Sequence, residues 1–503
     1  MFMKKYHYLL TLLLTLFFVS CFEDETTIAD MTSLSEITIK EGSIKAVYNI
    51  NKNETLVISP ELSQSNKEKP LKYTWEIDLE EYSYEKELNY YGDKLGVYNC
   101  RFIAENEDGK TFFPFKLYVN SPYEEGITVL SADSEGRPML SFMQTPTVEG
   151  ETGTFTTEEL LTFNNSEIEF ASNPSDMIQS GNTLFLVCKG GDTGADAPTI
   201  YYLNEKTFMV ESMFEVRDYA DFKPTKLLMP STWGEYVNCP VVCENGNVYG
   251  FSPFEAAVGP LTKLSYNYSQ AVSVDDGDYY YDMLLWDKDA NALALIYGGY
   301  GPFYFSQKYQ LSRSDSNFES LNYFKGHNFV TIVPVKMTQD EVKLNGYEAI
   351  VLTKNSIMNY ALVVGTNFWG YDFTNRDYVL RDNGGFKMVG FGSVSINDNT
   401  PCIASKTYQT MFFAEGNKVR KWNYTTSQEI TAAKTHLVVG SDDAVITGFE
   451  MSADQQITYV AFYEPNQDGK NGSVWSFDTD KGTVINKWDN ISFKPVKMFY
   501  KNK

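Results

Sequence analysis

The sequence predicts an all-β protein, with a β-sandwich over residues 34–121 followed by a β-propeller over residues 122–503. Three observations lead to this prediction. Apolar and polar residues alternate in short segments through the first region, a phrase ending in a charged residue and Met recurs through the second, and the two ends of the second region complement each other. Alternation with a period of two is typical of strands that bury one face.

Residues 1–20 have the composition of a secretory signal. Two lysines precede an apolar run over residues 9–19, which is too short to span a bilayer, and Ser20 precedes Cys21. This arrangement resembles the lipobox of bacterial lipoproteins, although Phe18 departs from the usual leucine. The resemblance implies that Cys21 is the site of lipid attachment and that the mature protein is anchored by its acyl chains. The alternative is ordinary secretion.

Residues 21–33 show no apolar periodicity and are predicted to form a lipidated tether. The acidic tripeptide Glu23-Asp24-Glu25 resembles the export signal that directs lipoproteins of Bacteroidetes to the outer face of the outer membrane. The alternative interpretation is a solvated linker. We therefore expect an outer-membrane location, facing the cell exterior.

The charge balance limits the partners of the chain. The formal net charge of the 503 residues is −24, and removal of the signal, which contains two lysines and no acid, lowers it to −26. Such a balance argues against nucleic acid and anionic lipid surfaces as partners. It is compatible with a cation, or with a neutral glycan or peptide.

The sandwich is predicted from alternating segments that are separated by turns such as Asn106–Gly109. These segments are 37–39, 55–58, 73–77, 96–103 and 112–119. The sequence around Tyr73-Thr-Trp75, followed by Gly96-Val-Tyr98, resembles the PKD-like module of the immunoglobulin type. That resemblance implies that Trp75 is the core tryptophan of a central strand, with a role in packing.

The propeller is predicted from a repeated phrase at the start of apolar strands. Its occurrences are Asp176-Met177, Lys226-Leu227, Asp282-Met283, Lys336-Met337, Lys387-Met388, Glu450-Met451 and Lys497-Met498. The mean spacing is about 53 residues, slightly longer than that of propeller-blade repeats, and strand pairs follow the phrase in most units. Repeated meanders of this kind form a propeller.

The ends of the repeat region predict how the ring closes. Residues 493–500 contain the phrase with no strand pair after it, whereas 126–130 and 138–142 form a pair with no phrase before it. Together they complete the first of seven blades and remove an exposed sheet edge. Segments 360–364 and 368–371 compete for one strand of the fifth unit, as do 401–404 and 411–413 in the sixth, which leaves six and eight blades as alternatives.

Few residues offer catalytic chemistry. His327 and His436 are the only histidines after the signal, and they fall in different repeats, so Ser/His/Asp and multi-histidine metal sites have little basis. We expect both histidines at the surface or in loops. No catalytic residue is assigned, although a pair of carboxylates acting on extracellular polymer, as in a propeller glycoside hydrolase or lyase, is kept as the alternative function.

The remaining cysteines and an acidic cluster have structural interpretations. After Cys21, five cysteines remain, and we expect them to be buried small side chains without a metal or a 239–243 disulfide; they are Cys100, Cys188, Cys239, Cys243 and Cys402. Asp275, Asp276 and Asp278 offer oxygen ligands for calcium, but their spacing is not that of an EF-hand. A solvated turn is the favoured interpretation, so no cofactor or metal is predicted.

Aromatic residues in predicted loops are the candidates for ligand binding. They are Trp233, Tyr236, Tyr300, Trp369 and Tyr371. Aromatic faces stack on sugar rings and peptide side chains, and propeller loops gather around the central opening. The alternative for each residue is packing within a blade.

The whole arrangement resembles the PKD-like surface lipoproteins of Bacteroidetes. Residues 21–119 and the segment 123–130 carry most of that resemblance. It implies a non-enzymatic accessory component of a SusC/SusD-like, TonB-dependent nutrient importer that binds glycan or peptide. The expected partners are therefore the importer complex, the ligand and, through the anchor alone, the membrane.

Overall fold

The structure is a computed structural model in which the chain forms two compact units, Met1–Pro122 (unit 1) and Tyr123–Lys503 (unit 2). It describes residues 34–502 with the backbone alone for 268–310 and 359–390, and leaves out 147–150, 157–159, 193–195, 229–238, 253–256, 261–267, 276–280, 288–291, 299–304, 311–327, 339, 342–347, 355–358, 366–368, 373–376, 381–388, 391–395 and 425–433.

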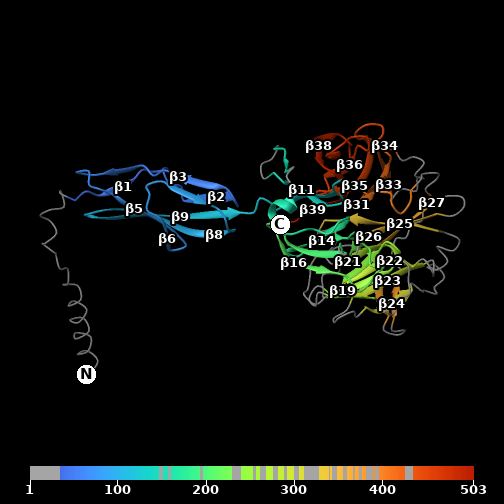
Figure 1. Ribbon diagram of the computed structural model, residues 1–503. Helices are drawn as coiled ribbons and strands as arrows, with labels where there is room; N and C mark the ends of the chain where they lie inside the picture. The colour runs from blue at the N-terminus through green and yellow to red at the C-terminus, as the bar shows by residue number, and fades with distance from the viewer. Residues whose placement is uncertain are drawn as a thin grey trace, which may run out of the picture. The chain divides into compact units, whose positions relative to one another are not determined.

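The described part of unit 1 consists of β-strands (Figure 1). They are β1 (Ile37–Ile39), β2 (Val47–Asn51), β3 (Thr55–Ile58), β4 (Leu62–Gln64), β5 (Lys72–Ile77), β6 (Glu80–Ser83), β7 (Leu88–Tyr91), β8 (Gly96–Asn106) and β9 (Gly109–Asn120). A five-stranded sheet has the order β2-β9-β8-β5-β6, and the pairs β1-β4 and β3-β7 form two smaller sheets. All of the segments predicted as strands are strands.

One hydrophobic core joins these sheets. Trp75 of β5 is completely buried, and its ring lies 4.4 Å from that of Phe102 and 6.0 Å from that of Phe115, measured between centroids. Its Nε1 donates a hydrogen bond of 3.0 Å to the carbonyl oxygen of Glu85. The predicted packing role of Trp75 is therefore confirmed.

Replacement of this tryptophan should destabilise unit 1. We expect Trp75→Ala to lower the free energy of unfolding by about 3–5 kcal/mol, because it removes a fully buried aromatic side chain and leaves a cavity. Urea unfolding of the two units measures the change. Tyr84→Ala is the control, since Tyr84 is 65% exposed; equal effects of the two substitutions would contradict the prediction.

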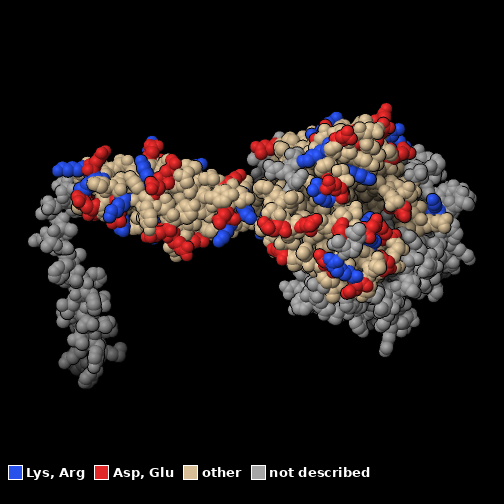
Figure 2. All heavy atoms as spheres, in the orientation of Figure 1, with Lys and Arg blue, Asp and Glu red and all other residues tan. Residues whose placement is uncertain are grey.

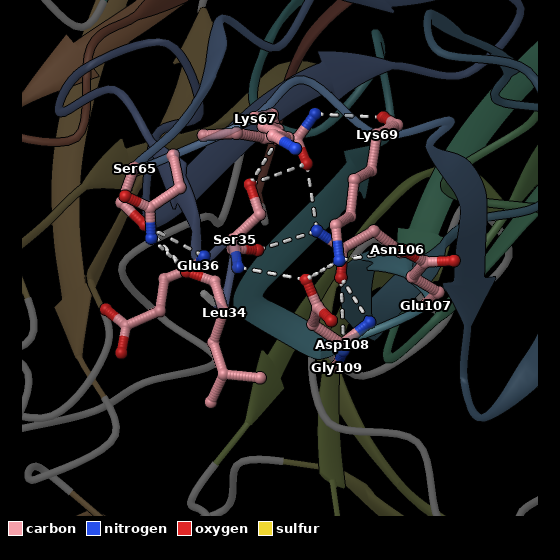
Figure 3. Close-up of polar contacts among 12 residues, drawn as sticks. Leu34, Ser35, Glu36, Ser65, Lys67, Lys69, Asn106, Glu107, Asp108 and Gly109 are labelled. Carbon is pink, nitrogen blue, oxygen red and sulfur yellow. Dashed lines mark hydrogen bonds and ion pairs between the residues drawn. The ribbon is translucent and has the colours of Figure 1, made fainter. Parts of the chain in front are cut away.

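Polar contacts fix the first described residues to the end of the β8–β9 hairpin (Figure 3). The backbone N–H of Ser35 donates to Asp108 Oδ2 at 2.9 Å, and Asn106 Nδ2 donates to the Ser35 carbonyl oxygen at 2.7 Å. Lys69 lies 2.5 Å from the same Asp108 oxygen and lowers the pKa of that carboxyl group. These contacts therefore fix the position of Ser35 next to the β8–β9 turn, just before the first strand of unit 1.

The described elements of unit 2 are strands together with the short helix α2. The elements are β10 (Gly126–Ala132), β11 (Pro138–Gln144), β12 (Phe155–Thr156), α2 (Leu160–Asn164), β13 (Pro174–Ser180), β14 (Thr183–Cys188), β15 (Thr199–Asn204), β16 (Val210–Glu215), β17 (Pro224–Leu227), β18 (Cys239–Cys243), β19 (Val248–Ser252), β20 (Ala257–Pro260), β21 (Tyr268–Asp275), β22 (Tyr281–Asp287), β23 (Ala292–Gly298), β24 (Phe305–Gln310), β25 (Asn328–Lys336), β26 (Glu348–Lys354), β27 (Asn359–Gly365), β28 (Trp369–Asp372), β29 (Asp377–Leu380), β30 (Val389–Gly390), β31 (Cys402–Ser405), β32 (Thr410–Glu415), β33 (Lys418–Asn423), β34 (Lys434–Val438), β35 (Val445–Met451), β36 (Ile457–Tyr463), β37 (Gly472–Asp478), β38 (Val484–Ser492) and β39 (Lys494–Lys501). No helix of the described chain is long and apolar enough to cross a membrane.

These strands form antiparallel sheets that follow one another along the chain. The orders are β12-β11-β10-β39, β13-β14-β15-β16, β17-β18-β19-β20, β21-β22-β23-β24, β30-β27-β26-β25, β31-β32-β33-β34 and β35-β36-β37-β38, with β25 and β31 joined in parallel. The end strands contact each other in the series β39, β13, β17 and in the series β21, β25, β31, β35, β39, while β18 contacts β21. The sheets thus surround a central axis.

The C-terminal strand lies in the same sheet as the first strands of unit 2 (Figure 1). Strand β39 pairs with β10 from Gly126↔Lys501 to Ala132↔Lys494. Gly126 is required there, since a Cβ at this position would lie 1.9 Å from the carbonyl oxygen of Met143. The pairing predicted from the two ends of the repeat region is therefore confirmed.

In one predicted unit the repeated phrase does not lie on the first strand of its sheet. Asp282 and Met283 lie on β22, the second strand of their sheet, because β21 precedes them. Strand β21 contains several polar residues, so the sequence pattern did not predict it as a strand. Lys387 and Met388 lie outside the described residues. The phrase therefore marks the end strands β13, β17, β25, β35 and β39.

Candidate binding site

The predicted aromatic binding residues are not brought together in the described part of the chain. Trp233, Tyr236 and Tyr300 lie outside the described residues. Trp369 and Tyr371 lie on β28, where their backbones pair with Leu380 and Tyr378 of β29. Both are thus placed in a β-hairpin strand, and a shared aromatic site stays a prediction.

The residue predicted for lipid attachment and the acids considered for calcium likewise lie largely outside the described chain. Cys21, Asp276 and Asp278 belong to segments that are left out, and Asp275 is the last residue of β21. No group of three or more His, Cys, Asp or Glu residues suited to a metal ion occurs among the described residues.

The structure instead points to a cavity at the centre of unit 2. It has a volume of about 570 Å³ and is lined by end strands of several sheets, including Lys226 of β17, Lys336 of β25, Cys402 of β31, Glu450 of β35 and Lys497 of β39. We call it the axial cavity. Its volume lies within the range of about 300–1,000 Å³ that is usual for small-molecule sites.

Three lysines gather at this cavity although the protein as a whole is strongly acidic. Lys and Arg side chains are otherwise interspersed with Asp and Glu on the visible face of unit 2 (Figure 2). The axial cavity is therefore a place where positive charge from separate strands converges.

Asp176 connects three end strands at the edge of the axial cavity. Its Oδ1 lies 3.0 Å from Lys497 Nζ of β39, and its Oδ2 accepts a hydrogen bond of 3.0 Å from the backbone N–H of Leu227 on β17. Only 4% of the Asp176 side chain is exposed. The charge of Asp176 raises the pKa of Lys497 above its usual value, so Lys497 stays protonated.

A second ion pair joins the end strands β25 and β35. Lys336 Nζ donates to Glu450 Oε1 at 3.0 Å, and the same oxygen accepts from the backbone N–H of Met451 at 2.9 Å. Both acids of the axial cavity thus have cationic and backbone donors at hydrogen-bond distance.

The surroundings shift the pKa of Lys226 in the opposite direction from that of Lys497. Burial, followed by the nearby positive charge of Lys497, lowers the pKa of Lys226 to about 8, and Asp176 only partly opposes these effects. A lysine whose charged form is disfavoured by its surroundings gains from any anion that approaches it.

Replacement of Lys226 by an apolar side chain should therefore stabilise the protein at neutral pH. We expect Lys226→Met to raise the free energy of unfolding by about 1–3 kcal/mol at pH 7. Because the folded-state pKa is lower than the unfolded value near 10.5, the penalty of Lys226 is fully present below pH 8 and disappears as the pH rises to about 10.5.

Urea unfolding of both proteins between pH 7 and pH 10.5 measures this difference. Lys481→Met is the control, since 74% of the Lys481 side chain is exposed. A difference between Lys226→Met and the unmodified protein that does not change over this pH range would contradict the assignment.

The histidine and cysteine predictions are partly corrected. His436 lies on β34 rather than in a loop and is half-buried, 5.2 Å from Phe412 between ring centroids. Burial lowers its pKa to about 4, because the charged imidazolium would lose hydration. His327 lies outside the described residues.

The predicted absence of disulfides holds for the described cysteines, all of which are free thiols. Four of them are buried as expected, whereas Cys402 is only half-buried because it faces the axial cavity. Burial raises the pKa of Cys402 to about 12, so this thiol is neutral and adds no negative charge to the cavity.

The charged residues of the axial cavity belong to the repeated phrase. The sequence analysis predicts blades from that phrase but does not predict that its charged residues line a cavity. The signal that identifies them is a charged residue directly before the buried Met or Leu of an otherwise apolar strand. A charge at such a position requires a partner or water, and this requirement singles out Asp176, Lys226, Lys336, Glu450 and Lys497.

Comparison with solved structures supports the propeller. The chain is 15% identical to a quinonprotein alcohol dehydrogenase-like protein from Bacteroides thetaiotaomicron VPI-5482, with a TM-score of 0.51 over 93% of this chain and 99% of that chain. It is 11% identical to apo AztD from Citrobacter koseri, with a TM-score of 0.40 over 86% of this chain and 98% of that chain. It is 9% identical to the β-propeller domain of Cps50 (Swd1) from Myceliophteria thermophila, with a TM-score of 0.37 over 64% of this chain and 88% of that chain.

No protein-family model matches the chain, and no curated protein matches it. At 15% identity, the first structural likeness shows the fold alone. The prediction of an all-β protein with a propeller is thereby confirmed.

Proposed function

We propose that this protein is a lipid-anchored protein of the outer-membrane surface that binds a glycan or peptide without turning it over, as an accessory component of a SusC/SusD-like nutrient importer. The observation that carries the binding function is the axial cavity, which combines about 570 Å³ with charged side chains from several sheets. Binding sites of propellers are formed where loops and end strands converge on the central opening.

The proposed finer architecture is a PKD-like sandwich followed by seven blades. The burial of Trp75, on strand β5 of the five-stranded sheet, supports the first part. Support for the second part comes from the succession of four-stranded groups in unit 2 and from the pairing of β39 with β10. A rigid ring of this kind would hold the axial cavity in shape.

The surface location rests on Cys21 and the residues around it. We expect Cys21→Ser to abolish incorporation of a fatty-acid label almost completely and to move the protein out of the outer-membrane fraction, because no other thiol follows a signal segment. Labelling and fractionation of the producing bacterium measure both effects. Cys402→Ser is the control, and a Cys21→Ser protein that remains labelled would refute the anchor.

Binding and catalysis are separated by one experiment on the purified protein. Libraries of oligosaccharides and oligopeptides are incubated with it, and both retention and cleavage are followed by mass spectrometry. The proposal expects retention of a ligand class with no cleavage. Cleavage would overturn the non-enzymatic function in favour of a hydrolase or lyase.

The importer association has its own test. Affinity purification of the native protein from detergent-solubilised outer membranes should recover a TonB-dependent channel and its lipoprotein partner in stoichiometric amounts. Recovery of the protein alone, under conditions that keep other importer complexes intact, would refute the association while leaving ligand binding untouched.

A further inference from the structure

The hairpin formed by β5 and β6 has an exposed leucine at its tip. Asp78 and Leu79 connect the two strands, and both have positive φ angles, of 48° and 71°. Glycine, asparagine and aspartate adopt this conformation readily, whereas leucine is disfavoured in it. Leu79 is also 81% exposed. A leucine at this position therefore favours neither the turn nor the core of unit 1.

Two exposed tyrosines follow Leu79 in the same short segment. Tyr82 lies on β6, the edge strand of the five-stranded sheet, and Tyr84 comes directly after it; they are 46% and 65% exposed. The Tyr82 ring lies 5.2 Å from that of Tyr90 between centroids, and the Tyr84 hydroxyl donates to Glu81 Oε2 at 2.5 Å. Both tyrosines are thus held in place, so they lose little conformational entropy on binding.

The negative charge of unit 1 is concentrated in the same part of the chain. Residues 78–87 contain five acids and one lysine, whereas the other described residues of unit 1 contain ten acids and ten basic residues. Figure 2 shows acidic side chains near β6, which Figure 1 labels in the same orientation. The described ion pairs of unit 1 use acids outside residues 78–87, namely Glu61, Glu76, Glu105, Glu107 and Asp108.

This combination of apolar and acidic residues selects among the possible occupants of the segment. A second copy of the chain would bring like charges together, and an anionic lipid surface would repel the same acids. The pairing of β5 with β6 is short and shifts register between Trp75 and Glu76, which makes β6 a poor template for an added strand. A partner is therefore expected to bind the side chains rather than the strand edge.

We infer that the segment Leu79–Tyr84 is a docking site for a partner protein that offers an apolar pocket with lysine or arginine side chains around it, and that Leu79 enters the pocket. Leucine and tyrosine anchors surrounded by polar residues are the usual anatomy of a protein interface, and the acids of residues 78–87 select a basic partner. This inference goes beyond the proposed function, because it concerns unit 1 and does not depend on the ligand of the axial cavity.

Photocrosslinking of the full-length protein in the organism that produces it tests the contact. The photoreactive residue p-benzoylphenylalanine replaces Leu79 in one variant and Val57 in the control, because Val57 on β3 is 53% exposed and lies outside the acidic segment. We expect a protein adduct from position 79 and none from position 57. Mass spectrometry of the crosslinked peptides should place the contact at an apolar site with neighbouring Lys or Arg residues.

The other outcomes of the crosslinking experiment overturn the inference. These outcomes are no adduct, an adduct with a second copy or with lipid, an adduct at an acidic site of another protein, and an equal yield of the same adduct from position 57.

Affinity measurements with the purified partner then separate docking from folding. Leu79→Gly should weaken binding tenfold or more without lowering the stability to urea, because glycine adopts a φ of 71° more readily than leucine. The double variant Glu80→Gln/Glu85→Gln should weaken binding and reduce its dependence on ionic strength, while Val57→Ser should leave it unchanged. Undiminished binding by Leu79→Gly, or binding that does not respond to ionic strength, would overturn the inference.

Discussion

Removal of residues 494–503 is expected to prevent unit 2 from folding cooperatively. The truncation deletes β39, which pairs with β10 over Gly126–Ala132 and buries Met498 and Phe499. Each buried apolar side chain contributes about 1.5–3 kcal/mol, and the exposed edge of β10 would lose its hydrogen-bond partners. Together these losses are comparable to the whole stability of a domain, about 5–15 kcal/mol.

Side-chain contacts at the same closure add to the expected loss. Tyr500 donates a hydrogen bond of 2.5 Å to Glu125 Oε1, and Lys501 donates to the carbonyl oxygen of Glu124. The backbone N–H of Asn502 donates to Gln179 Oε1 at 2.8 Å. Strand β39 is therefore connected to the start of unit 2 and to β13.

Limited proteolysis and near-ultraviolet circular dichroism measure the effect of the truncation. Unit 2 should become protease-sensitive while a fragment containing unit 1 remains protected, and a synthetic peptide of residues 494–503 should restore protection. Removal of Lys503 alone is the control. A truncated protein with the unfolding transition of the full chain would show that β39 is dispensable.

Asp176→Ala is expected to give the largest effect of a single substitution in the axial cavity, a loss of about 3–5 kcal/mol in the free energy of unfolding. The substitution leaves the Lys497 ammonium group without its carboxylate and the N–H of Leu227 without its acceptor. It also removes the charge that opposes repulsion between Lys226 and Lys497.

Urea unfolding measures the loss, and Glu215→Ala serves as the control because the Glu215–Arg217 pair is exposed and such pairs contribute about 0–1 kcal/mol. The double variant Asp176→Ala/Lys497→Met should recover part of the loss, since it removes both charges of the pair. An Asp176→Ala effect no larger than that of Glu215→Ala would contradict the linking role of Asp176.

Strands were predicted best where burial imposes a regular alternation. Strand β8 shows this pattern, with Cys100, Phe102 and Ala104 buried and the residues between them more exposed. Strand β6 was missed because most of its residues are exposed, and β2 because it pairs in parallel with β9, a segment distant in the sequence. Partners of this kind leave no local signal.

The ambiguous segments of the fifth and sixth predicted units show the same limit. The segments 401–404 and 411–413 were treated as competitors, yet β31 and β32 pair with each other in one sheet. Strands β27 and β28, in contrast, belong to different sheets. Composition does not separate these cases, because all four segments are apolar and only hydrogen-bond pairing assigns them.

The sequence by itself determined the strand-rich class, the repeat, the charged positions within it and the presence of Cys21 just after the apolar run 9–19. These properties are local, since they depend on alternation, spacing and residue type. Only the tertiary structure decided that Asp176 lies 3.0 Å from Lys497 and that Lys336 lies 3.0 Å from Glu450. Such pairs form because closure of the sheets around one axis brings their end strands together, and the resulting convergence of charge is a property of the ring rather than of any repeat.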